Sequence, residues 1–331
     1  MKALLNKMIE HRSLSREEAR IVMLNMADGK YNDALLSAFM TVFLMRSITV
    51  DEISGFRDAL LERKREIKLD CGDAIDIVGT GGDGKNTFNI STCSCFVVAG
   101  AGKKVVKHGN YGASSVSGAS NVLEVNGVKL TDNQDILQKS LDESGVAFLH
   151  APLFNDAMKA VAPVRKALGL RTFFNILGPL VNPALPKKQM LGVYNLKLMR
   201  LYTYLTRDYG VDCTVVHSLD GYDEISLTSP FKISGACGEA IVTPDEIGFN
   251  CYRQEELSGG TTVEDASRIF INVLKGKATE AQTNCVVANS AYALKTIDNQ
   301  LSIQDALQQA RISIESGNAF KAFEKFIRIN S

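Results

Sequence analysis

The chain of 331 residues is long enough to bury a full core and to form two domains. Its 37 basic and 37 acidic residues cancel, so no net field draws it to nucleic acid or to an anionic membrane. The seven cysteines are odd in number and form no C-x-x-C pair, which argues against a disulfide framework and structural zinc and favours a cytoplasmic protein. We expect neither a signal peptide nor a membrane span.

The order of the predicted elements changes twice along the chain. Residues 1 to about 66 predict helices only, and the capping boxes Ser15-x-x-Glu18 and Thr49-x-x-Glu52 precede amphipathic runs. From about Leu69, strand-length apolar runs alternate with helical stretches, and after about residue 260 the chain is helical again. The predicted strands are AIDIV, KKVVK, GVAFL, QMLGVY, CTVVH and KIS. This alternation predicts a mainly parallel sheet covered by helices, with ligands at the carboxyl ends of the strands.

A proline-broken helical segment runs from Asn155 to about Asn182, with Pro163 inside it. We expect this segment to return to the N-terminal helices. The fold class is therefore α/β, with a small helical domain and a larger α/β domain. We assign residues 1–68, with a returning segment at about 155–185, to the helical domain, and residues 69–154 and 186–331 to the α/β domain.

The most informative motif is DIVGTGGDGKNTFNIST, which runs from Asp76 to Thr92 and resembles a phosphate-binding loop. Its four glycines can turn backbone N–H groups toward an anion, and a helix starting near Ser91 would add its own. Two nucleotide fingerprints fail here. The region that would hold a ribose-binding acid is basic, and Asn86 replaces the Ser or Thr of a Walker A loop. A structural turn without a ligand remains the alternative.

Two further loops follow predicted strands and carry suitable chemistry. The stretch from Lys107 to Ser117 offers a cation and several hydroxyls to a phosphate, although a solvated Ser-rich turn would look the same. The stretch SLDGYDEIS carries Asp223 and Glu224. Adjacent carboxylates are often only a surface feature, but beside a polyphosphate they would suit magnesium. No Ser-His-Asp or Cys-His arrangement supports nucleophilic catalysis.

These motifs, with KHGN, SSVSG, VRKALGLRTFFNILGPLVNPA and DGYDEIS in this order, resemble the anthranilate phosphoribosyltransferase family of tryptophan biosynthesis over nearly the whole chain. The resemblance implies a fold similar to the pyrimidine nucleoside phosphorylases and a homodimer joined through the helical domains. It implies transfer of phosphoribose from phosphoribosyl pyrophosphate to the amino group of anthranilate, with release of pyrophosphate. It also implies magnesium, with two ions per subunit.

The resemblance assigns binding roles and no general acid or base. It implies magnesium contacts at Ser91, Asp223 and Glu224, and anthranilate contacts at Gly79, Asn110 and Arg165, whose guanidinium would pair with the carboxylate. It implies phosphoribosyl pyrophosphate contacts at Gly79, Gly82, Asp83, Thr87, Asn89, Ile90, Ser91, Thr92, Lys107, His108, Gly109, Asn110, Tyr111, Gly112, Ala113, Ser114, Ser115 and Ala119.

Two other functions remain open at this point. A pyrimidine nucleoside phosphorylase-like enzyme would share the fold, but phosphorolysis does not need the acid pair Asp223-Glu224. A non-catalytic, nucleic-acid-binding relative would be expected to carry a basic surface, whereas this chain has zero net charge.

Some positions depart from the usual pattern of that family. Tyr111 stands where Arg is commoner, and Ala119 and Asn121 lie in SGASN where SGSAD is usual. In FNDAMK, Asn155 and Asp156 stand where the family usually has His-Pro, and that histidine normally lines the acceptor channel.

We predict weak binding of anthranilate because Asp156 adds negative charge near the path of an anionic substrate and the histidine is absent. The Asn155→His variant should therefore have a lower KM for anthranilate in steady-state kinetics. An unchanged or higher KM would contradict this prediction.

Overall fold

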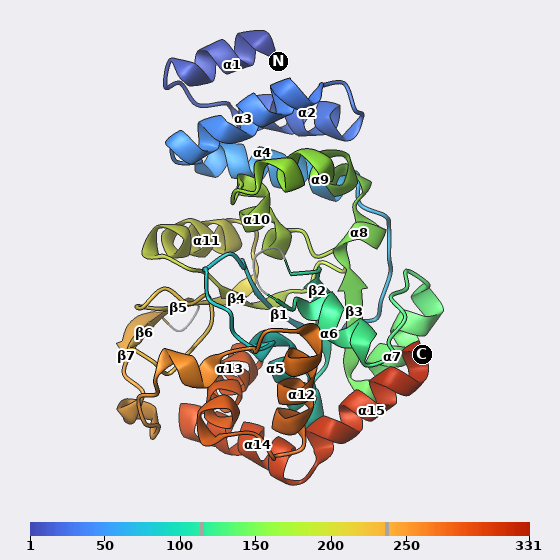
Figure 1. Ribbon diagram of the computed structural model, residues 1–331, viewed down its shortest axis with the longest axis vertical. Helices are drawn as coiled ribbons and strands as arrows, with labels where there is room; N and C mark the ends of the chain where they lie inside the picture. Colours follow the sequence, from blue (N-terminus) through green and yellow to red (C-terminus); the bar gives the residue numbers. More distant parts are fainter. Residues whose placement is uncertain (113–115, 236–237) are drawn as a thin grey trace. The chain divides into compact units, whose positions relative to one another are not determined.

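The computed structural model describes residues 1–112, 116–235 and 238–331, so the predicted contacts at Ala113, Ser114 and Ser115 lie outside the described residues. The described chain forms two compact units, residues 1–67 with 151–183, and residues 68–150 with 184–331. Figure 1 traces their elements in sequence colours. Within the described ranges, no helix has the length and the apolar character that a membrane crossing requires.

The first unit is a helical bundle. It consists of α1 (Lys2–Ile9), α2 (Arg16–Ala27), α3 (Asp33–Met45), α4 (Val50–Glu62), α8 (Ala151–Phe154), α9 (Asp156–Leu168), α10 (Phe173–Leu177) and the 3-10 turn η1 (Gly178–Leu180). Both predicted capping boxes are present at the starts of α2 and α4. Helix α9 contains Pro163 and packs on α2 and α3.

Aromatic packing holds the inside of this bundle together. Phe173 of α10 stacks on Phe56 of α4 with ring centroids 4.6 Å apart, and its edge meets Phe43 of α3 at 4.8 Å. Phe39 meets Phe43 and Phe56 from the same cluster. Pairs of this kind contribute about 0.5–1.5 kcal/mol beyond the area that they bury. Helix α10 is thus anchored to helices far from it in sequence.

The second unit contains a sheet of seven strands in the order β3-β2-β1-β4-β5-β6-β7. The strands are β1 (Ile75–Gly79), β2 (Val105–Gly109), β3 (Val146–His150), β4 (Lys188–Gly192), β5 (Asp212–Ser218), β6 (Phe231–Gly235) and β7 (Gly238–Val242). Neighbours from β3 to β5 are parallel, whereas β5-β6 and β6-β7 are antiparallel. The prediction of a mainly parallel sheet is confirmed. Strand β7, which is short and exposed, was not predicted.

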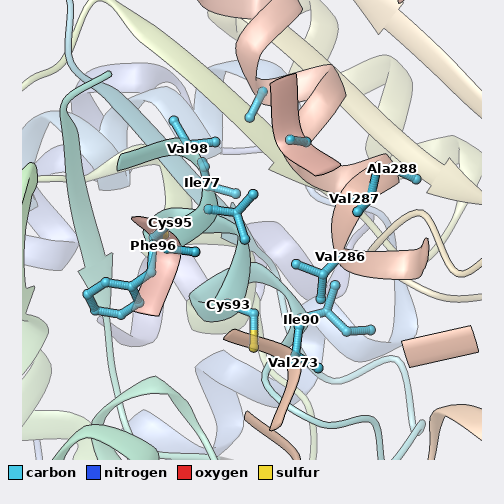
Figure 2. Close-up of a cluster of buried hydrophobic side chains, with 14 of the residues drawn as sticks. Ile77, Ile90, Cys93, Cys95, Phe96, Val98, Val273, Val286, Val287 and Ala288 are labelled. Atoms are coloured by element: carbon cyan, nitrogen blue, oxygen red, sulfur yellow. The ribbon is translucent and has the colours of Figure 1, made fainter. Parts of the chain in front are cut away.

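Helices cover this sheet. They are α5 (Ile90–Gly100), α6 (Ala119–Val125), α7 (Gln134–Ser144), α11 (Leu196–Asp208), α12 (Val263–Leu274), α13 (Glu280–Ile297), α14 (Ile303–Glu315) and α15 (Asn318–Asn330), with short turns η2 (Asp245–Ile247) and η3 (Gln254–Leu257). The helical character predicted after residue 260 is confirmed. Figure 2 shows Ile90 of α5 beside Val286 of α13 and Cys93 of α5 beside Val273 of α12, in a buried cluster that also contains Ile77 of β1. This core fixes the carboxyl end of β1.

Gly55 provides a test of the packing between α2 and α4. A Cβ at this position would lie 2.1 Å from the carbonyl oxygen of Arg16. Alanine gains up to about 1 kcal/mol of helix propensity over glycine, but overpacking typically costs about 1–3 kcal/mol. We expect Gly55→Ala to lower the urea midpoint of unfolding.

Gly178→Ala is the matched control, because a Cβ there meets no atom within 4 Å. A Gly55→Ala variant as stable as the wild type would show that the two backbones can separate at no cost.

Candidate active site

The glycine-rich loop between β1 and α5 adopts the backbone expected of an anion-binding turn. Gly81, Gly82 and Gly84 have φ of 65°, 71° and 77°, a region that side chains disfavour. Helix α5 begins at Ile90, as predicted near Ser91, and Asn89 is its N-cap residue. The loop therefore brings backbone N–H groups and a helix N-terminus to the carboxyl edge of the sheet.

Gly79 has a different role from the one its motif suggests, because its φ is not in the left-handed region. A Cβ on Gly79 would lie 2.3 Å from Asp223 Oδ2. Gly192, its register partner on β4, would place a Cβ 1.6 Å from the carbonyl oxygen of Asp223. Two paired glycines at adjacent strand ends thus leave the space that Asp223 occupies.

The acid pair in the loop after β5 lies against the glycine-rich loop. The backbone N–H of Gly81 donates to Asp223 Oδ2 at 2.6 Å, and the N–H of Ser91 donates to Glu224 Oε1 at 3.0 Å. Asp223 is 7% exposed, and Asp83 approaches it closely enough to affect its ionisation. The structure therefore brings the predicted Asp83 and Ser91 of the glycine-rich loop together with the acid pair Asp223-Glu224.

Asp220 does not belong to this group. Its carboxylate accepts hydrogen bonds from the hydroxyls of Thr228 at 2.6 Å and Ser229 at 2.8 Å. These bonds close the turn between β5 and β6. In SLDGYDEIS, the first acid thus stabilises the loop, and only the last two point toward the glycine-rich loop.

Burial and mutual repulsion dominate the ionisation of the acid pair. Desolvation and the neighbouring Asp83 carboxylate raise the pKa of Asp223 to about 7. The same causes, with Asp223 itself, raise the pKa of Glu224 well above its ordinary value, although the Ser91 N–H and Lys107 oppose this shift. Clustered acids with raised pKa values are typical of sites that receive a cation.

Magnesium fits this donor set in part. Within the described ranges, no three metal-binding side chains converge closely enough to hold an ion unaided. Magnesium normally uses one or two carboxylates and takes its remaining ligands from substrate phosphates and water. Asp223 and Glu224 match that pattern.

Lys107 is buried beneath the glycine-rich loop instead of extending into solvent. It is 2% exposed, and its Nζ donates to the carbonyl of Ile77 at 2.5 Å and lies 3.4 Å from Ser91 Oγ. Its charge acts on Glu224. The ammonium group of Lys107 therefore offsets part of the negative charge of Glu224 and holds the Ser91 hydroxyl in place.

Hydrogen bonds and close packing connect the predicted residues of the second loop to neighbouring elements of the α/β unit. The carbonyl of Asn110 accepts from Ser120 N–H at 3.2 Å, and Gly109 packs so tightly that a Cβ would lie 2.7 Å from Phe148. Tyr111 Oη lies 3.1 Å from Glu124 Oε1, and its ring meets the His150 ring edge-on.

Two other predicted residues of this loop belong to its supporting elements. His108 is buried, and its backbone N–H donates to Asp76 Oδ1. Ala119 starts helix α6.

Two asparagines that sequence analysis did not assign to the site connect its loops. Asn121 Oδ1 accepts from both Gly112 N–H and Gly118 N–H at 3.0 Å. Asn86 Oδ1 accepts from Val116 N–H at 3.3 Å, and its amide donates to Gly260 at 2.7 Å. Asn86 stands where a Walker A loop has the Ser or Thr that binds magnesium. This departure from the motif was the sequence signal that Asn86 has another role.

The remaining residues of the first loop differ in their surroundings. Ile90 and Thr92 are buried, and Ile90 belongs to the core beneath α5. Thr87 pairs with Ser258. Thr80 Oγ1 and Asn89 Oδ1 are buried and have no hydrogen-bond partner among the described residues. Such groups cost roughly 1–3 kcal/mol each unless a ligand satisfies them. Thr80, which the sequence analysis missed, is therefore a further candidate contact.

Arg165 lies on α9 of the helical unit. Its guanidinium carbon lies 5.3 Å from the ring centroid of Phe174, and its Nη2 lies 3.4 Å from Asn175 Oδ1. Burial lowers the pKa of Arg165. No acidic side chain pairs with it among the described residues.

Comparisons with known proteins match the whole chain. Residues 71–320 match the glycosyl transferase family α/β domain, and residues 2–64 match the helical bundle domain of the same family. The anthranilate phosphoribosyltransferase of Bacteroides fragilis is 58% identical over 330 residues, which cover 100% of both chains. This chain belongs to the anthranilate phosphoribosyltransferase family.

Solved structures of anthranilate phosphoribosyltransferases agree. The Thermus thermophilus enzyme has a TM-score of 0.90 and 32% identity, covering 98% of each chain. The Saccharomyces cerevisiae enzyme in complex with phosphoribosyl pyrophosphate and magnesium has a TM-score of 0.89 and 27% identity, covering 98% of this chain and 96% of that one. The predicted fold class is confirmed. The chain transfers a phosphoribosyl group from phosphoribosyl pyrophosphate to the amino group of anthranilate in tryptophan biosynthesis.

The raised pKa of Asp223 predicts how stability depends on pH in an anthranilate phosphoribosyltransferase without metal. The folded state holds a proton up to about pH 7, whereas the unfolded carboxyl loses it near pH 4. The stabilisation from this proton is complete below pH 4 and is lost as the pH rises to about 7. Between pH 5 and 8, Asp223→Asn should therefore flatten the fall in melting temperature measured by calorimetry.

Asp73→Asn, at an exposed acid, serves as the control. Magnesium with pyrophosphate should raise the wild-type melting temperature more at pH 8 than at pH 6. Equal increases at both pH values would contradict the assignment of the raised pKa to a cation-receiving site.

Proposed function

We propose that the loops after β1 and β2 hold phosphoribosyl pyrophosphate. Support comes from the left-handed glycines and from the N-terminus of α5 at Ile90. The buried oxygens of Thr80 and Asn89, which have no hydrogen-bond partner among the described residues, support it as well. The contacts fall on Gly82, Asp83, Thr87 and Asn89–Thr92 in the first loop and on Lys107–Gly112 and Ala119 in the second. The Saccharomyces cerevisiae relative, which was solved with this substrate and magnesium, supports the assignment.

We further propose two magnesium ions per subunit, held by Ser91, Asp223 and Glu224 together with substrate oxygens. Magnesium, when bound, supplies positive charge to the pyrophosphate leaving group. The observation that carries this proposal is the juxtaposition of the acid pair and the glycine-rich loop through Gly81–Asp223 and Ser91–Glu224. Lys107 fixes the Ser91 hydroxyl from beneath.

Arg165 fits the anthranilate carboxylate because it is a half-buried cation with no acidic partner in the described chain. A guanidinium can bind a carboxylate through two parallel hydrogen bonds. Gly79 and Asn110 complete the proposed anthranilate contacts. The aromatic amine is neutral and nucleophilic at pH 7, so orientation is the main requirement and the proposal includes no general base.

The reaction breaks the bond between ribose C1 and the pyrophosphate oxygen and forms a bond from C1 to the amine nitrogen. Positive charge develops on the sugar and negative charge on the leaving group. In this proposal, the loop N–H groups stabilise the leaving group. The amine proton leaves to solvent or to the departing pyrophosphate.

We also propose a homodimer joined through the helical unit and a cytoplasmic location. The dimer is supported by exposed apolar side chains on α1 to α3, namely Ile9, Ile21, Leu44 and Met45. The location is supported by the free thiols among the described cysteines. The two compact units correspond to a helical domain and an α/β domain in this proposal.

The metal assignment predicts the behaviour of Glu224→Gln. Loss of this carboxylate should lower kcat about 100-fold, which corresponds to about 2.7 kcal/mol in the transition state. Higher magnesium should restore part of the loss. The assay follows the fall of anthranilate fluorescence with phosphoribosyl pyrophosphate and magnesium.

Glu239→Gln, at an exposed acid on β7, is the matched control and should retain wild-type kcat. A Glu224→Gln enzyme with wild-type kcat and magnesium dependence would refute the metal assignment.

A further inference from the structure

Helix α10 places two consecutive side chains, Phe174 and Asn175, against the guanidinium of Arg165, and a third, Phe173, anchors the helix. Phe173 is anchored in the aromatic cluster, where it stacks on Phe56 at 4.6 Å. Phe174 stacks on Phe173 at 4.5 Å and carries the Arg165 guanidinium over its ring. Asn175 places its side-chain oxygen 3.4 Å from Arg165 Nη2. A short helix fixed in the bundle core therefore holds an arginine that extends from α9.

The oxygen of Asn175 is itself fixed by a second donor. The backbone N–H of Thr172 donates to Asn175 Oδ1 at 3.2 Å, so the same oxygen caps the first turn of α10. An aspartate at this position would cap the turn equally well, because first-turn carboxylates are favourable at a helix N-terminus. Helix stability alone therefore gives no reason for an amide here.

The reason lies in the charge on Arg165. A carboxylate beside a half-buried guanidinium would pair with it and cancel its charge. The amide oxygen orients the guanidinium and leaves the charge available. The Phe174 ring acts in the same way, since a cation over an aromatic face is held without being neutralised.

We propose that Asn175 is a positioning and specificity-determining residue. It orients Arg165 with a neutral acceptor and keeps the guanidinium charge free for acceptor substrates that carry a carboxylate beside the amine. This inference rests on the proposed role of Arg165 in binding the anthranilate carboxylate. It adds that a neutral partner is what makes Arg165 selective for an anionic acceptor.

Asn175→Asp tests the inference, because it preserves the cap and introduces a competing charge. We expect the KM for anthranilate to rise about tenfold or more, since a charge-assisted bond is exchanged for an internal one. The KM for phosphoribosyl pyrophosphate should stay within about twofold. The rate with the neutral acceptor 2-aminobenzamide should also change little.

Asn175→Ala is the second variant, and for it we expect the order of KM values to differ from the order of melting temperatures. It removes the cap and the acceptor but adds no charge, so its melting temperature should be the lowest of the three proteins. Its KM for anthranilate should nevertheless lie between those of the wild type and Asn175→Asp. If Asn175 only supported the helix, KM would follow melting temperature, and Asn175→Ala would be the worst enzyme.

The matched control is Asn32→Asp, which makes the same chemical change at the N-cap of α3, where Asn32 Oδ1 accepts from Leu35 N–H at 3.0 Å. It should retain wild-type KM values. Arg165→Leu, measured in parallel, separates the two claims. If Arg165→Leu raises the anthranilate KM and Asn175→Asp does not, the inference about Asn175 is overturned while the role of Arg165 stands. If Arg165→Leu leaves that KM unchanged, the proposed role of Arg165 fails and the inference fails with it.

Discussion

Repulsion among three carboxylates, one buried and two half-buried, is the constraint on which this site depends. Asp83, Asp223 and Glu224 approach one another at the carboxyl edge of the sheet, where little water remains to separate their charges. Burial and mutual repulsion favour a shared proton or a cation over full ionisation. Lys107 supplies one compensating charge from below, but it is committed to the Ile77 carbonyl and Ser91. A divalent cation bound beside these acids would relieve their repulsion. Without one, the fold itself must hold the acids together.

The core of the α/β unit supplies the restraint. On α13, the buried amide of Asn289 donates to the Ile225 carbonyl at 2.8 Å and accepts from the Ile225 N–H at 3.1 Å, immediately beyond the acid pair. Ser218 Oγ donates to the Glu224 carbonyl at 2.7 Å. A side chain in place of Gly79 or Gly192 would collide with Asp223, so only glycine fits at those two strand ends. Hydrogen bonds from Asn289 and Ser218 to the backbone thus hold the segment that carries Asp223 and Glu224 in place.

Sequence analysis could predict the parallel sheet, the glycine-rich loop and the acid pair because each depends on a local pattern. Strand-length apolar runs, positive-φ glycines and adjacent acids are all visible within a few residues. It could not predict why Gly79 is a glycine, since the reason is the Asp223 carboxylate, 144 positions further along the chain. It also could not show that Lys107 is buried or that Asp220 is satisfied by two hydroxyls. Those facts depend on contacts between distant segments, and strand β7 depends on pairing with β6 more than on its own composition.

Neutral amides hold several of this molecule's loops and one of its functional side chains. Asn86 and Asn121 tie the second loop to its neighbours, Asn289 fixes the segment after the acid pair, and Asn175 orients Arg165. An amide offers both a donor and an acceptor without adding charge. A carboxylate at the position of Asn175 would pair with the Arg165 guanidinium, whereas the amide orients it without adding charge. At these four positions, neutral hydrogen bonds therefore hold the loops and the guanidinium in place without adding charge beside them.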